Sequence, residues 1–237
     1  MDSDQIPPNV RSHRDLWFET SVVLLLGVIP HLFNAIATFY IESGPRQSFV
    51  YQSLFTIVRS AGIIALVLFI ISRSGESPSV FGLKPLRKFK DSAQGFGIFV
   101  LGMVLYYFIW YRAEALLGHQ TTYRFLHSDV SHIAIPTRRD SISLVAIASI
   151  ANGLAEELVC RAYLITRFEK LFNSTAKAWV LSSLLFGSYH IYQGLGGFIS
   201  ITVIGLLYGG IFCRTRRIWP IAIAHAIEDF VATVMRM

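Results

Sequence analysis

Charged residues inside long apolar segments constrain this chain more than any other feature. The stretch from Asn152 to Arg161, NGLAEELVCR, lies in an apolar run that begins near Ile142. Such a run is long enough to cross a membrane as a helix, yet it contains Glu156, Glu157 and Arg161. Charges at membrane depth are costly and usually face a protein interior or a wet cavity. We therefore expect this helix to line a site whose other groups lie elsewhere in the chain.

The spacing of these charges predicts different roles for the two glutamates. Glu157 and Arg161 are four residues apart, so they share a helical face with the acid on the N-terminal side, the favourable order for an ion pair. Glu156 points about 100° away around the helix and has no such partner. Glu156 is then free to act as a base, although a structural ion network between helices explains the triplet equally well.

Composition assigns the chain to the membrane proteins. Of its 237 residues, 53% are hydrophobic and 15% are charged, and the mean hydropathy is +0.51; soluble domains average about 25% charged residues. We predict an all-α, polytopic helical bundle with about seven transmembrane helices. The predicted helices cover residues 18–40, 49–72, 91–113, 141–168, 176–192, 195–214 and 218–235. The two cysteines lie in or beside apolar segments, which favours packing over a disulfide.

The predicted helices divide the chain into three parts. Residues 1–17 form a polar tail, residues 18–140 contain three helices without a motif and a long loop, and residues 141–237 contain the charged core. Pro30 is expected to kink the first helix, with His31 packing beside it. Arg59 interrupts the apolar pattern of the second helix.

The long loop, residues 114–140, contains three histidines, but their spacing matches no closed metal site. We expect a solvated loop outside the membrane without catalytic residues. The histidines are His119, His127 and His132.

The basic residues predict the orientation. Thirteen of the 21 lysines and arginines fall on the side of the N-terminus, in the tail and in the loops near Arg73, Arg167 and Arg214. The positive-inside rule then places the N-terminus in the cytoplasm and the C-terminus outside, and we expect the plasma membrane of a prokaryote. Because the net charge of +6 gathers beside the spans, it indicates lipid contact and no nucleic-acid partner.

Two later segments supply groups that could meet the charged helix. The fifth predicted helix contains FGSYH, which ends in His190, and the seventh contains HAIED, with His225 and Asp229 four residues apart on one face. One free carboxylate, two histidines and a further acid could therefore converge within the bilayer.

The three motifs, EELVCR, FGSYH and HAIED, resemble in order the EExxxR, FxxxH and Hxxx(N/D) motifs of the CPBP intramembrane proteases. This family includes the type II CAAX prenyl proteases and the bacteriocin-processing (Abi) proteins. The resemblance covers about residues 140–235. Asp229 stands where the prenyl-protein enzymes usually have Asn.

The resemblance implies a glutamate-dependent endopeptidase that cleaves a membrane-associated protein or peptide, prenylated or not. It implies that Glu156 activates a water held by His190, and that His225 and Asp229 stabilise the oxyanion. Its other site residues are Glu157 and Arg161, which would position these groups, and Phe186, a candidate for binding the substrate.

The resemblance leaves the metal open, since Glu156, His190 and His225 are a plausible Zn²⁺ set and also serve a metal-free mechanism. Asp229 could donate a hydrogen bond as a protonated acid, or could accept one from His225 and fix its tautomer. The competing functions are a proton-coupled transporter, for which the chain lacks a pair of broken helices, and a non-catalytic membrane scaffold.

Overall fold

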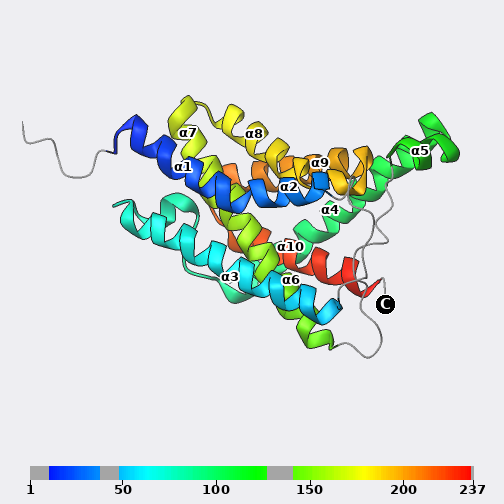
Figure 1. The fold of residues 1–237 in the computed structure, drawn as a ribbon, viewed down its shortest axis with the longest axis horizontal. Coiled ribbons are helices and arrows are strands. Elements are labelled where there is room, and N and C mark those ends of the chain that lie inside the picture. The colour runs from blue at the N-terminus through cyan, green and yellow to red at the C-terminus, as the bar shows by residue number, and fades with distance from the viewer. Residues whose placement is uncertain (1–10, 38–47, 127–140, 236–237) are drawn as a thin grey trace, which may run out of the picture.

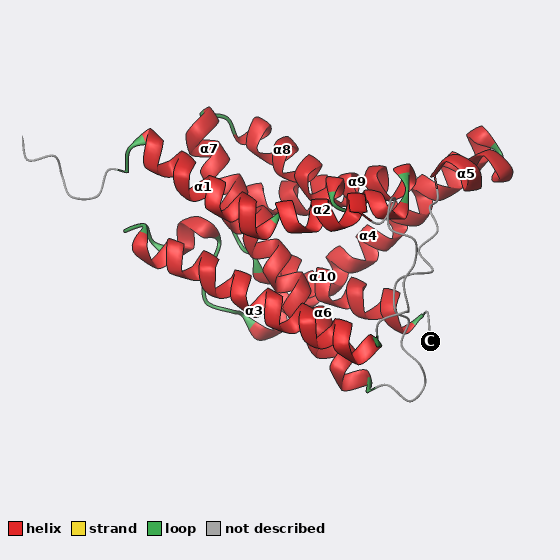
Figure 2. Ribbon diagram, in the orientation of Figure 1, coloured by secondary structure: helices red, strands yellow, loops and turns green. Residues whose placement is uncertain are grey.

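The computed structural model describes residues 11–37, 48–126 and 141–235, and within these ranges it is helical with no strand (Figure 2). The α-helices are α1 (His13–Gly27), α2 (Ile29–Ala37), α3 (Phe49–Arg73), α4 (Lys88–Leu117), α5 (His119–Leu126), α6 (Ile142–Glu157), α7 (Thr166–Phe172), α8 (Thr175–Ser188), α9 (Leu195–Thr215) and α10 (Trp219–Val234). Three short helices join them: η1 (Pro78–Phe81), the π-helix η2 (Leu158–Ile165) and η3 (Ile191–Gln193). The predicted all-helical fold is confirmed.

Five helical segments in the described ranges are long and apolar enough to cross a membrane. They are His13–Ala37, Phe49–Arg73, Lys88–Leu117, Ile142–Phe172 and Leu195–Thr215. The predicted count of seven was approximate, because α8 and α10 have only 14 and 16 residues. The chain leaves α8 before Tyr189, and α10 begins only at Trp219, where Pro220 occupies the first turn, its usual place in a helix.

Local differences from the prediction have physical reasons. The first helix breaks at Val28, two residues before Pro30, because proline cannot donate to the helical ladder and clashes with the preceding turn. In contrast, α3 runs unbroken through Arg59. The expected loop after residue 114 is helical to Leu117 and again over α5, while its residues 127–140, including His127 and His132, lie outside the described ranges.

The continuous helix α6–η2–α7 crosses the centre of the molecule, as Figure 1 shows. It packs against α3 on one side and α10 on the other, and α8 and α9 pack together beyond η2. All residues from Leu158 to Phe168 are buried. By contrast, α3 and α4 expose large apolar side chains such as Phe55 and Phe108. Apolar surface on this scale marks an interaction with a partner or a membrane, so the outer helices have the surface of lipid-facing spans.

The contact between α6 and α10 depends on Gly153. A Cβ atom built on this glycine would lie 3.0 Å from the backbone nitrogen of Ala226. The two backbones can therefore approach closely only where residue 153 has no side chain, as is common between membrane helices. This contact brings the glutamates at the end of α6 beside His225 of α10.

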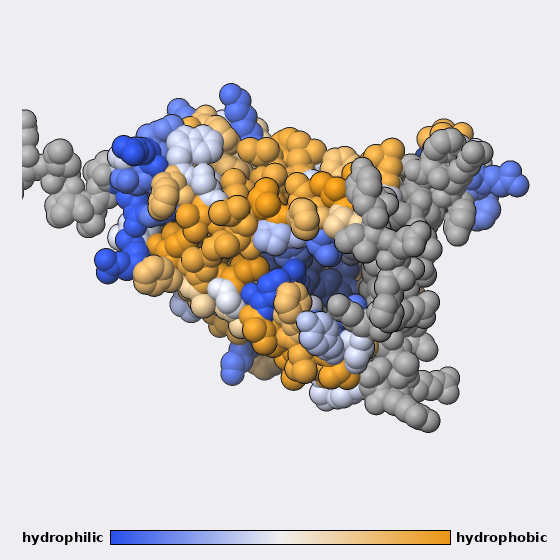
Figure 3. Space-filling view, viewed as in Figure 1, coloured by the Kyte–Doolittle hydropathy of each residue, from blue (hydrophilic) through white to orange (hydrophobic). Residues whose placement is uncertain are grey.

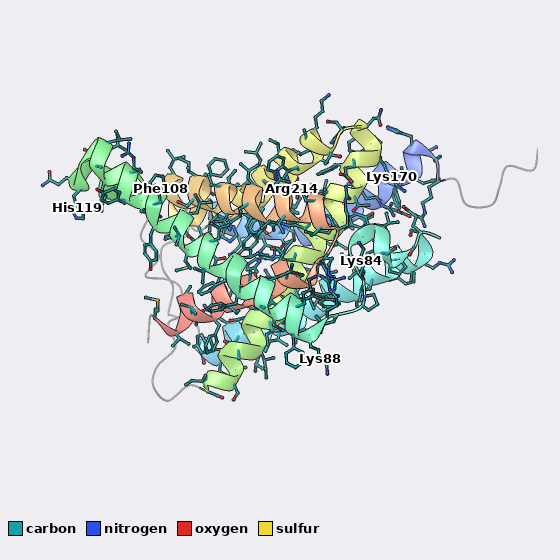
Figure 4. The ribbon with its side chains drawn as sticks, turned by 180° about the vertical axis from the view of Figure 1, so that it is seen from behind. Lys84, Lys88, Phe108, His119, Lys170 and Arg214 are labelled. Carbon is teal, nitrogen blue, oxygen red and sulfur yellow. The ribbon has the colours of Figure 1, made fainter. Side chains whose placement is uncertain are left out.

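Ion pairs between charged residues tie several helices and loops together. Arg167 and Lys170 of α7 pair with Glu76, Arg216 pairs with Glu169, and Arg217 pairs with Asp91 of α4. Figure 4 shows Lys84, Lys88, Lys170 and Arg214 toward one end of the molecule and His119 at the opposite end. We refer to these pairs as the ion network; it joins loops that are far apart in the sequence.

Candidate active site

Glu157 forms the buried anchor of the site. Its side chain is fully buried, and its Oε1 lies 3.0 Å from Nη1 of Arg161 and 2.8 Å from Nδ1 of His225. The Glu157–Arg161 pair predicted from the spacing is present. An ionised carboxylate only accepts hydrogen bonds, so Nδ1 of His225 carries the proton and donates to Glu157. Glu157, rather than Asp229, therefore fixes the tautomer of His225.

Glu156 lies beside this pair but makes different contacts. Its side chain is nearly buried, with 8% of the residue exposed. Oε1 accepts a hydrogen bond of 3.3 Å from Nδ2 of Asn152. Oε2 lies 3.6 Å from Nε2 of His225 and has no hydrogen-bond partner among the described residues. One oxygen of Glu156 is thus held in place, and the other is free to react.

Asp229 and Asn152 complete the side of the site formed by α6 and α10. Nδ2 of Asn152 donates to Oδ2 of Asp229 over 3.0 Å, and Oδ1 of Asp229 lies 3.7 Å from Nε2 of His225. Asn152 therefore joins Glu156 and Asp229 through one amide group. We did not predict a role for Asn152. It lies four residues before Glu156 on the same helical face, and this spacing could have predicted the contact between them.

His190 lies just after the end of α8, whereas we predicted that it lies within a helix. Its side chain caps α8. Its Nδ1 lies 2.9 Å from the carbonyl oxygen of Phe186, one of the last carbonyls of α8, which lack partners within the helix. A carbonyl only accepts, so Nδ1 of His190 donates and Nε2 stays available as an acceptor.

Phe186 packs inside the site. It is 3% exposed, its ring lies 4.0 Å below the guanidinium of Arg161, and it contacts the rings of His190 and His225. A cation over an aromatic face is attracted by the ring. This placement favours a packing role for Phe186 over the substrate contact that we expected.

Two residues from the motif-free helices also reach the site. Nη1 of Arg59 lies 3.3 Å from Nδ1 of His31, and Nη2 donates to Oδ1 of Asn152 over 3.4 Å. The His31 ring also packs 5.0 Å from that of Tyr189. We predicted that His31 is a packing residue and that Arg59 only interrupts the apolar pattern of its helix. A charge at membrane depth is costly, as we argued for Glu156, and the same argument could have predicted that Arg59 faces the site.

These groups surround a polar cavity that opens on the apolar surface. It is narrow, and its polar lining includes His31, Arg59, Ser60, Asn152 and Glu156. Figure 3 shows a hydrophilic hollow between α2 and α3, with hydrophobic residues above it and to its left. We call this feature the polar crevice. Four basic side chains interact electrostatically with Glu156 beside it, namely His225, His190, His31 and Arg59.

The π-helix η2 begins directly after the two glutamates. A π-helix is rare, and such wide turns are found mostly at functional sites. All eight of its residues are buried, so its wider backbone is enclosed by packing. Sequence patterns based on 3.6 residues per turn did not predict it.

Three residues of the site are candidate ligands of a metal ion. Glu156, His190 and His225 have the composition of a zinc site, and each histidine keeps one ring nitrogen free. However, within the described ranges no three His, Cys, Asp or Glu side chains are arranged so that they could hold a metal ion together. The arrangement of the described side chains therefore does not fit a metal ion.

The fold and the site define a class of protein: a multi-pass helical membrane protein with acidic and basic side chains gathered at an interior crevice. Residues 138–231 match the family model described as type II CAAX prenyl endopeptidase Rce1-like. The match contains the three motifs and confirms the resemblance predicted from them, and at the level of the family it supports a CAAX-type protease. No curated protein and no solved structure matched the chain.

Proposed function

We propose that this protein is an intramembrane endopeptidase of the CAAX-protease type and that Glu156 is its general base. The observation that carries the proposal is the position of Oε2 of Glu156. This buried oxygen has no hydrogen-bond partner among the described residues, lies beside Nε2 of His225, and belongs to the glutamate that lines the polar crevice. A general base needs an acceptor within reach of the proton that it removes. Because Asn152 donates to Oε1, the carboxylate cannot turn freely and the orientation of Oε2 is fixed.

In the proposed reaction, Oε2 of Glu156 takes a proton from water as the water oxygen bonds to the carbonyl carbon of the scissile peptide. His190, with its free Nε2, helps to hold this water. The carbonyl π electrons move to the oxygen and form an oxyanion. The C–N bond then breaks, its electron pair stays on the leaving nitrogen, and Glu156 returns the proton to that nitrogen.

His225 is proposed to stabilise the oxyanion. Because its Nδ1 donates to Glu157, its Nε2 can donate only when the ring is an imidazolium. Glu157 and Asp229 flank the ring, and negative charge beside a histidine favours its protonated form. Arg161 balances Glu157 and is proposed to keep it in place. Preorganised donors of this kind supply a large part of catalysis in acyl transfer.

The substrate class follows from the matched family, whose description names a CAAX prenyl endopeptidase. We propose a protein or peptide held at the membrane, with a prenylated C-terminus as the first candidate and a bacteriocin leader as the second. Because the crevice opens among hydrophobic residues, a substrate with an apolar anchor can approach it from the bilayer.

The proposal is tested with purified protein in lipid nanodiscs and quenched fluorescent peptides. The panel contains a farnesylated CAAX peptide, its unprenylated form and a mixture of leader peptides whose products are identified by mass spectrometry. Glu156→Gln should lower the turnover of any cleaved peptide by 10²-fold or more, about the share of a general base. Glu228→Gln is the matched control, because Glu228 is a nearby carboxylate of α10 that accepts from Tyr208 instead.

Near-wild-type cleavage by Glu156→Gln would overturn the proposed mechanism, and the failure of the wild-type protein to cleave any peptide of the panel would count against the substrate class. The same assay with a chelator, and then with added Zn²⁺, tests metal dependence separately.

A further inference from the structure

Arg59 differs from the other arginines that are enclosed in the described part of the molecule. Arg161, Arg167, Arg216 and Arg217 each form an ion pair with a glutamate or aspartate. Arg59 has no carboxylate within ion-pair distance among the described residues. It contacts a histidine nitrogen at 3.3 Å and an amide oxygen at 3.4 Å, and its buried Nε has no hydrogen-bond partner in the part of the chain that the structure describes.

An unpaired guanidinium within an apolar helix needs a reason. Arginine stays charged under all ordinary conditions, and such charges within membranes usually pair or mark a substrate path. Arg59 lies in the middle of α3, a candidate membrane span, and it lines the polar crevice together with Glu156. A group bound by Arg59 would therefore lie in the same cavity as the proposed base.

The chemistry of the side chain indicates the kind of group. The guanidinium presents its N–H donors in a planar fork that matches a carboxylate. Nε–H has no acceptor among the described residues, and the hydrogen bond from Nη2 to Asn152 is long, so the N–H groups could turn to a stronger acceptor. We infer that Arg59 binds a carboxylate of the substrate close to the scissile peptide bond. This inference rests on the proposed function and makes Arg59 a specificity-determining residue outside the matched segment, residues 138–231.

A second role for Arg59 must be distinguished. Arg59 interacts electrostatically with Glu156, so it could act only by favouring the ionised form of that base. In that case, its loss would slow the cleavage of every substrate alike. If it binds a carboxylate, its loss would affect only substrates that carry one.

The experiment measures binding to the Glu156→Gln protein, which isolates binding from turnover. Three fluorescent farnesylated peptides that differ only at the C-terminal residue or its end group are compared by polarisation in nanodiscs. One ends in a free carboxylate, one ends in a carboxamide, and one ends in a carboxamide but has glutamate as its last residue. We expect at least one peptide with a carboxylate to bind about tenfold more tightly than the neutral amide, and the two acidic peptides separate a C-terminal from a side-chain carboxylate.

The same peptides are then bound to the double variant with Arg59→Met. This variant should lose the tenfold preference and bind the neutral amide as before, and Arg59→Lys should keep part of the preference. Arg73→Met is the matched control, because Arg73 lies on the same helix but is exposed and does not line the crevice. Thermal unfolding in detergent checks that each variant is folded.

Equal binding of the three peptides to the Glu156→Gln protein would overturn the inference even if Arg59→Met fails to fold. A preference that survives Arg59→Met would also overturn it. Neither result touches the proposed function, which depends on cleavage by the wild-type protein and its loss in Glu156→Gln.

Discussion

At the scale of single residues, two adjacent glutamates receive opposite roles from their neighbours. Glu157 contacts a guanidinium and an imidazole N–H, and both contacts hold it as a structural anion. Glu156 accepts from one amide and lines the polar crevice, which Glu157 does not reach. The helical rotation of about 100° between successive residues is enough to separate these surroundings. The interior of the protein, rather than the side chains themselves, differentiates the pair.

The contacts of Asp229 bear on its two possible roles, a protonated hydrogen-bond donor or an ionised group beside His225. Its Oδ2 accepts from Asn152, and its Oδ1 faces Nε2 of His225 across 3.7 Å, too far for a hydrogen bond. We therefore expect Asp229 to act as an ionised counter-charge that favours the imidazolium form of His225. Asp229→Asn and Asp229→Leu should both lower turnover by tenfold or more, and for Asn the pH–rate profile should lose activity at a lower pH because the imidazolium loses its counter-charge.

The measurement is kcat against pH for wild type and both variants on one cleaved peptide. A protonated, donating Asp229 predicts instead that Asn keeps most of the activity while Leu does not. If Leu matches the wild type over the whole range, Asp229 has no part in catalysis.

At the scale of elements, the site depends on how closely α6 and α10 approach. The backbone of Ala226 lies where a side chain on Gly153 would begin. Gly153→Leu should force the helices apart, separate the glutamates from His225, and lower both thermal stability in detergent and turnover. The control is Gly62→Leu, since Gly62 lies exposed on α3 with no atom within 4 Å of a built Cβ. Equal effects of the two substitutions would contradict this account.

The elements also explain which parts of the site could be predicted. Spacing within one helix predicted the Glu157–Arg161 pair, and the shared face of His225 and Asp229, because both are local. The contacts of Arg59 and Asn152 depend on α3 packing against α6, which no local pattern encodes. The π-helix and the end of α8 before His190 likewise depend on packing, so the motifs predicted the residues of the site but not their full surroundings.

At the scale of the whole molecule, the ion network holds distant loops together at one end. Glu76, in the loop after α3, accepts hydrogen bonds from Arg167 and Lys170 of α7. Burial raises the pKa of Glu76, but the hydrogen bonds from Lys170 and Arg167 lower it by more, so that its pKa lies below the ordinary 4.5. The stability that the folded state gains from this carboxylate is therefore complete above pH 4.5 and is lost as pH falls through the lowered pKa.

Glu76→Gln tests this linkage. At pH 7 it should lower the melting temperature in detergent by roughly 2–4 °C, the shift expected for about 1 kcal/mol in a chain of this size. The difference from wild type should shrink once the pH falls below 4.5, because the wild-type carboxylate is then protonated as well. Glu114→Gln is the control, since the one ion pair of Glu114 within the described ranges is with the exposed His119. A difference that stays constant with pH would show that the carboxylate charge is not what stabilises the fold.

The apolar frame around the polar crevice has a consequence for the direction of the proposed reaction. Hydrolysis converts one neutral amide into a carboxylate and an amine, and both ionise when they reach water at neutral pH. Lipid solvates such ends poorly, so each fragment gains free energy by moving its new end to the aqueous phase. Once the fragments part in this way, re-ligation would require both ends to lose their charge and return together. The bilayer around the crevice would thus favour cleavage of the peptide bond over its re-formation.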